Sequence, residues 1–173
     1  MIPRWLSVAI VVGVVLIGVQ LSAQSAMAVY EEDQGQSTRS FDQEVIFCYS
    51  DWIASVTQPD DKTSATYSAQ RTSQCLFGAQ AHVWFQFELT HTPPNGGTYL
   101  MWHHDKNPYT SPGCYAVTYC EMTEAGTTTQ PGFYQLTSWA NFHASLEGTP
   151  WQWPVKAIGW TVKGPPGPFG AQN

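Results

Sequence analysis

The chain has 173 residues, which is enough for one hydrophobic core and too few for two of ordinary size. Its net formal charge is −6, the opposite of the positive charge that a nucleic-acid-binding surface requires, so we expect no nucleic-acid partner. Only 12% of the residues are charged and 14% are aromatic, a composition that excludes an intrinsically disordered protein.

Residues 1–28 have the three-part layout of a secretory signal peptide. Arg4 and the free amino group precede an apolar run over residues 5–19, and the small residues Ala26 and Ala28 follow at the two positions that a signal peptidase must accommodate. This pattern predicts cleavage before Val29 and a secreted protein, either extracellular or periplasmic. After cleavage we expect no contact with a membrane.

An uncleaved membrane anchor is the alternative for this segment. A helix that spans a membrane needs about 20 apolar residues. The run reaches that length only if Ser7, Gln20 and Ser22 are counted as part of it. We therefore favour the signal peptide.

The remainder of the chain divides into three parts. Residues 29–40 contain Glu31, Glu32 and Asp33 without apolar periodicity, which predicts a flexible lead. Residues 41–163 are expected to form the folded domain. Residues 164–173 are rich in proline and glycine and are interpreted as a tail.

The folded domain is predicted to be all-β. No window in it keeps the i, i+3, i+4, i+7 spacing of a helix, and β-branched and aromatic residues alternate with polar ones between turn signals about ten residues apart. About seven antiparallel strands predict a two-sheet β-sandwich, immunoglobulin-like (Ig-like) or jelly-roll-like. A closed β-barrel is the alternative.

The four cysteines predict two disulfides, because the count is even and the chain is expected to be exported: Cys48, Cys75, Cys114 and Cys120. A turn at residues 59–62 joins two alternating runs and sets a register in which Cys48 lies opposite Cys75. Cys114 and Cys120 can then bond only if residues 111–113 and those that follow form a tight loop. We favour this loop over the alternative, in which all four cysteines pair between strands.

A second hairpin contains the candidate binding site. Residues 82–91 and 98–106 alternate on either side of a turn, and pairing Thr92 with Thr98 places Trp102 opposite Glu88 and His104 opposite Gln86. One face then presents a mixed aromatic and polar set: Trp84, Gln86, Glu88, Trp102 and His104. Indole rings beside hydrogen-bonding groups are typical of surfaces on which sugars stack. Trp151 and Trp153 are predicted as a second exposed pair.

These residues favour a secreted, non-catalytic binding domain whose partner is a glycan or another cell-surface ligand. Two other functions stay open: a structural, assembly or adhesin-type envelope protein, and a secreted hydrolase. A glycoside hydrolase needs two carboxyl groups about 5 to 9 Å apart in a cleft. The sequence fixes no second carboxylate beside Glu88, so no catalytic residue is predicted.

No metal ion or cofactor is predicted either. No two cysteines have the C-x-x-C spacing of a structural zinc site. His103 and His104 are neighbours on a predicted strand and point to opposite faces, so they cannot bind one ion together. The sequence does not specify an oligomeric state.

Overall fold

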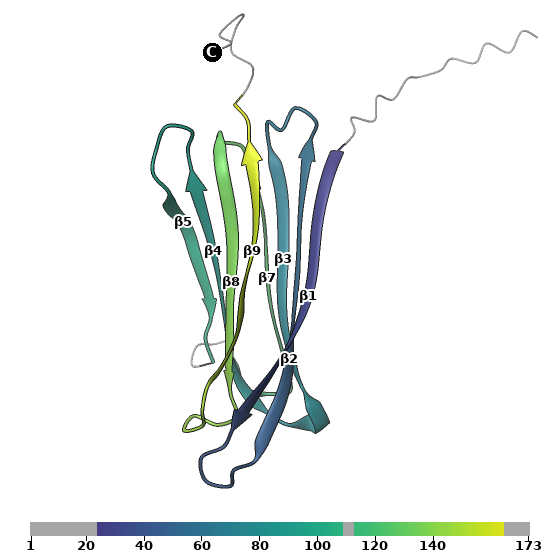
Figure 1. Ribbon diagram of the computed structural model, residues 1–173, viewed down its shortest axis with the longest axis vertical. Helices are drawn as coiled ribbons and strands as arrows, with labels where there is room; N and C mark the ends of the chain where they lie inside the picture. Colours follow the sequence, from purple (N-terminus) through teal and green to yellow (C-terminus); the bar gives the residue numbers. More distant parts are fainter. Residues whose placement is uncertain (1–23, 109–112, 165–173) are drawn as a thin grey trace, which may run out of the picture.

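The computed structural model describes residues 24–108 and 113–164, which form nine strands in two antiparallel sheets (Figure 1). The first sheet has the order β1-β2-β3-β7, and its strands are β1 (Gln24–Thr38), β2 (Val45–Pro59), β3 (Ala65–Cys75) and β7 (Tyr119–Thr128). The second has the order β5-β4-β8-β9, and its strands are β4 (Ala81–Thr92), β5 (Tyr99–Lys106), β8 (Gly132–His143) and β9 (Trp151–Val162). The short β6 (Cys114–Val117) also pairs with β4, and a 3₁₀ turn, η1 (Leu76–Gly78), precedes β4.

The predicted all-β sandwich is therefore confirmed, with nine strands instead of about seven. The alternative of a closed barrel is wrong, because the strands described here pair only within one sheet or the other. Among the same residues, no helix has the length and apolar character needed to cross a membrane.

The strand order is that of an immunoglobulin-like sandwich with one added edge strand. β2, β3 and β7 in one sheet, and β5, β4, β8 and β9 in the other, have the neighbours of the A, B, E and C′, C, F, G strands of that fold. Tyr134, near the start of β8, donates a hydrogen bond from its hydroxyl to the Gln130 carbonyl, 3.0 Å away, as in the tyrosine corner of such sandwiches. The jelly-roll-like alternative is not the observed topology.

The first hairpin has the predicted register. Trp52 pairs with Arg71 and Cys48 with Cys75 along β2 and β3, and the same register holds as far as Thr57. The inward side of this hairpin faces the second sheet, where Trp52 packs on Phe87 with ring centroids 5.7 Å apart. The core thus lies between the two sheets.

Residues 29–40 do not form a flexible lead. They lie mostly in β1, which pairs with β2 along its whole length, from Gln24 to Thr38. The inward positions of β1 are mostly polar, so the apolar alternation that marks the other strands is missing here. Residues 1–23, which include most of the predicted signal peptide, and residues 165–173 of the predicted tail lie outside the described residues. Cleavage before Val29 stays a prediction.

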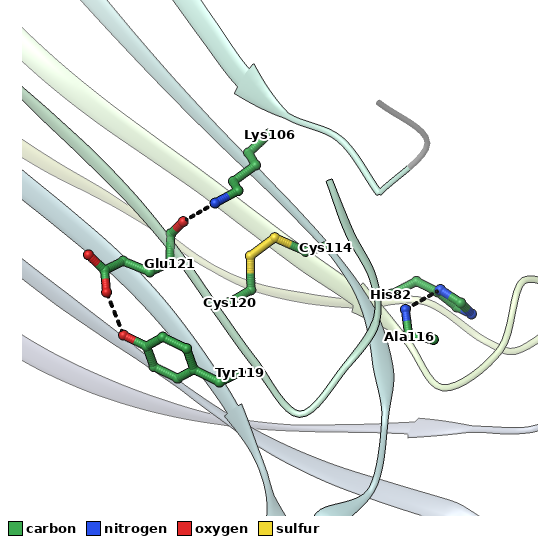
Figure 2. The surroundings of a disulfide bond; sticks show 7 residues. All are labelled: His82, Lys106, Cys114, Ala116, Tyr119, Cys120 and Glu121. Atoms are coloured by element: carbon green, nitrogen blue, oxygen red, sulfur yellow. Dashed lines mark hydrogen bonds between the residues drawn. A yellow bond between two sulfur atoms is a disulfide. The ribbon is translucent and has the colours of Figure 1, made fainter. Parts of the chain in front are cut away.

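Both predicted disulfides are present. Cys48–Cys75 joins β2 to β3, and Cys114–Cys120 closes a tight loop between β6 and β7, with Cα atoms 5.9 Å apart (Figure 2). Ala116 has a left-handed backbone conformation (φ 48°), which lets the chain reverse within this loop. Its N–H donates to Nδ1 of His82 on β4, so the loop is fastened to the second sheet.

Candidate functional site

The β4–β5 hairpin changes register along its length. Next to the turn the pairing is as predicted, but it shifts by one residue between Leu89 and Thr90. Beyond this bulge Trp102 lies opposite Leu89 and His104 opposite Phe87. Because a shift of one residue moves each side chain to the other face of a strand, the prediction that Trp102 and His104 share a face with the other candidate residues is wrong.

Trp102 and His104 point instead toward the first sheet. Trp102 is half-buried and stacks on the His104 ring, with centroids 4.7 Å apart. His104 Nδ1 lies 2.8 Å from Oε1 of Glu124 on β7. Two residues further along β5, Lys106 Nζ donates to the Glu121 carbonyl over 2.6 Å (Figure 2). These contacts join β5 to β7 and close one open side of the sandwich.

Trp151 and Trp153 do not form an exposed pair. Trp153 is only 3% exposed and packs on Phe142, with ring centroids 4.7 Å apart. Trp151 is half-buried, and its ring covers Gly35 on β1. The expectation of exposure was wrong because this segment is the first part of β9, whose inward positions contribute to the core.

The other three candidates, Trp84, Gln86 and Glu88, do lie together on the outer face of β4. On the neighbouring strand β8, Asn141 pairs with Trp84 and Trp139 pairs with Gln86. Partners in a strand pair share a face, so Trp84 and Trp139 are diagonal neighbours on the outside of the second sheet. We call the set Trp84, Gln86, Trp139 and Asn141 the indole face.

Trp139 is a site residue that the sequence reasoning missed. Tyr134, Leu136 and Phe142 on β8 are buried and have even numbers, so an odd-numbered residue on the same strand points away from the core. This parity could have placed Trp139 on the outer face. It was overlooked because registers were derived for two hairpins only, and β8 belongs to neither.

A shallow depression of about 90 Å³ lies on the indole face, lined by Trp84, Gln86, Trp139 and Asn141, with Ala140. Both indoles are half-buried. Within the described residues, Trp84 Nε1 and Asn141 Oδ1 are buried and have no hydrogen-bond partner. A ligand could reach these atoms only after a side-chain rotation.

The ionisable side chains around the indole face are two carboxylates and a histidine. Glu88 Oε1 lies 3.0 Å from Nδ1 of His103 across the β4–β5 hairpin, and Asp105 pairs with Gln86. In β4, β5, β8 and β9 the lysines and arginines are Lys106 and Lys156, and both point toward the first sheet. The face therefore offers no cation from these strands to an anionic ligand. In residues 24–108 and 113–164, no cluster of three or more His, Cys, Asp or Glu side chains could hold a metal ion.

Comparison with known proteins gives no family for this chain. No family model matches it, and no curated protein matches it. Among solved structures it resembles one described as "X-ray structure of Northeast Structural Genomics Consortium target SoR45", with 15% identity, a TM-score of 0.31, and coverage of 83% of this chain and 89% of that one. A likeness at that TM-score supports no conclusion about fold or function.

Proposed function

We propose that this chain is an exported, non-catalytic binding domain that engages a glycan through the indole face. The observation behind the proposal is the pair Trp84 and Trp139, diagonal on an outer sheet face and flanked by the amides of Gln86 and Asn141. The apolar face of a sugar ring packs on an aromatic plane while flanking polar groups bond its hydroxyls. Two disulfides suit an oxidising compartment outside the cytosol.

The test compares three single variants in a polysaccharide pull-down and on a glycan array. Trp139→Ala and Trp84→Ala each remove one ring, and each is expected to weaken binding roughly fivefold, since a lost stacking contact is worth about 1 kcal/mol. Tyr30→Ala is the matched control, because Tyr30 is 62% exposed on the outer face of the other sheet. Binding that survives both tryptophan substitutions unchanged would remove the proposal.

The same assay tests the hydrolase alternative. Glu88 and Asp105 lie on the outer face of the β4–β5 hairpin, diagonal to each other, since Gln86 pairs with Asp105 and Glu88 with His103. Release of reducing ends from a bound polysaccharide that disappears in Glu88→Gln would favour a hydrolase over a binding domain. We expect binding without release.

A further inference from the structure

β1 is attached to the sandwich mainly through polar contacts. Its inward positions after Val29 are Glu31, Asp33, Gly35 and Ser37, and Val29 is only partly buried against the core. Apolar burial therefore holds this strand much less than it holds the strands of the core. The backbone ladder to β2 and a few specific side-chain contacts hold it instead.

Two buried cations find their ion-pair partners on β1. Arg71 of β3 is 0% exposed, and its guanidinium lies 3.8 Å from Oδ2 of Asp33. Lys156 of β9 is 8% exposed, and its Nζ lies 2.8 Å from the same oxygen and also bonds Glu31. Burial would lower the pKa of Lys156, but the hydrogen bonds that its ammonium group donates to Asp33 and Glu31, together with the charges of these carboxylates, outweigh burial and raise the pKa. We call the site beside β2 that β1 fills the groove. Its two cations make it complementary to a strand with inward-facing carboxylates.

The groove also fixes the register of the strand that it holds. A Cβ atom at Gly35 would lie 2.3 Å from Cδ1 of Trp151, so only glycine fits beneath that ring without a shift. Two residues later, the Ala144 N–H donates to Ser37 Oγ over 2.9 Å, and Ser37 donates to the Thr149 carbonyl. The groove is complementary to the pattern Glu-x-Asp-x-Gly-x-Ser, which β1 supplies at residues 31–37.

The connection between β1 and β2 is suited to opening. Residues 39–44 form a short exposed turn in which Gln43, a non-glycine residue, has a left-handed backbone (φ 54°). Arg39 bonds Glu44 there and Ser40 donates to the Glu147 carbonyl, but these contacts are exposed and therefore weak. Because no strand precedes β1 among the described residues, β1 can leave its groove without displacing another of the described strands.

We propose that β1 is exchanged between two copies of this chain, so that the β1 of each copy fills the groove of the other. A vacated groove would deprive Arg71 and Lys156 of their carboxylate partners on β1 and would expose to water the inner face that β1 covers. A second copy supplies a strand with the matching charges, glycine and serine in the matching register. Exchange of an end strand in this way is a low-cost route to a dimer.

The test uses two full-length variants with opposite charge reversals. One combines Glu31→Lys with Asp33→Lys, which reverses both inward charges of β1, and the other is Lys156→Glu, which reverses one of the two cations of the groove. Each alone places like charges together in a partly buried site, and we expect its melting temperature to fall by about 10 °C. Refolded together with disulfides intact, they are expected to form a heterodimer in which one groove has the complete wild-type set of charges.

The readouts are mass by light scattering, capture of the untagged variant by a tagged one, and the melting temperature. Exchange predicts a captured heterodimer whose melting temperature lies near that of the wild type. A mixture that stays monomeric, with each variant melting at its own temperature, would overturn the proposal. If neither variant folds alone, recovery of a folded heterodimer supports exchange, and failure to recover under conditions that refold the wild type overturns it.

Two controls accompany the test. Glu32→Lys with Gln34→Lys makes a comparable charge change on the outward side of β1 and should leave the melting temperature within a few degrees of the wild type. The wild type itself is refolded at increasing concentration, alone and mixed with a tagged copy. A fraction of captured dimer that rises with concentration supports exchange, and its absence at millimolar concentration counts against it.

Discussion

Gly35→Ala is the substitution for which the structure gives the clearest cost. The added methyl group would lie 2.3 Å from Cδ1 and 2.4 Å from Nε1 of Trp151, and 2.9 Å from Cε1 of Phe142. Overpacking of this kind typically costs about 1 to 3 kcal/mol. The loss of glycine's freedom in the unfolded chain returns about 0.4 to 1 kcal/mol. We expect a net destabilisation of about 1 to 2 kcal/mol, measured by urea unfolding followed through tryptophan fluorescence.

The matched control for this prediction is Gly97→Ala. An added Cβ at Gly97 meets nothing within 4 Å, so the substitution should be neutral or slightly stabilising. A double-mutant cycle with Trp151→Ala, which removes the crowding indole ring, should recover about 1 kcal/mol of the cost. If Gly35→Ala is as stable as Gly97→Ala, or if the cycle shows no coupling, the placement of Trp151 over β1 is wrong.

Three further predictions concern stability. Burial and the neighbouring His143 lower the pKa of His82, so as the pH falls this histidine is protonated in the unfolded state before it is protonated in the folded state. The free energy of unfolding should therefore fall from pH 7 to pH 5. In His82→Asn, which keeps a hydrogen-bond acceptor, urea unfolding should show a flatter pH dependence. Tyr134→Phe removes the hydroxyl of the tyrosine corner and should cost about 1 to 2 kcal/mol by the same method. Replacing both cysteines of Cys48–Cys75 by serine should cost about 3.5 kcal/mol, and replacing those of Cys114–Cys120 should cost about 2 kcal/mol. The costs differ because the first disulfide closes a longer loop of the chain than the second. Equal costs would contradict this chain-entropy argument.

The two hairpins show what alternation can specify and what it cannot. The turn at residues 59–62 joins strands without an irregularity, so counting outward from it gave the Cys48–Cys75 contact correctly. The second hairpin has three apolar residues in succession after its turn, Tyr99, Leu100 and Met101, and the extra residue is absorbed as a bulge. Nothing in a period-two pattern says which residue is left unpaired, so the faces of Trp102 and His104 could not be assigned.

β1 was missed for a different physical reason. Its inward residues are charged or small because they face Arg71 and Lys156 and lie beneath Trp151. These partners are far away in the sequence, and a run such as residues 31–37 resembles a solvated lead when read alone. Strands held by long-range ion pairs leave no periodic signal, whereas strands held by apolar burial do.

The placement of Trp102 decides which experiment can identify the binding site. Its ring stacks on His104, which in turn bonds Glu124 of the opposite sheet, so Trp102→Ala would loosen the junction between β5 and β7 whether or not a ligand binds nearby. A loss of binding in that variant would therefore report on stability as much as on recognition. Trp139 lies on the outer face, opposite Gln86, and makes no ring contact with another aromatic side chain among the described residues. A loss of binding in Trp139→Ala without a loss of stability would consequently locate the ligand on the indole face.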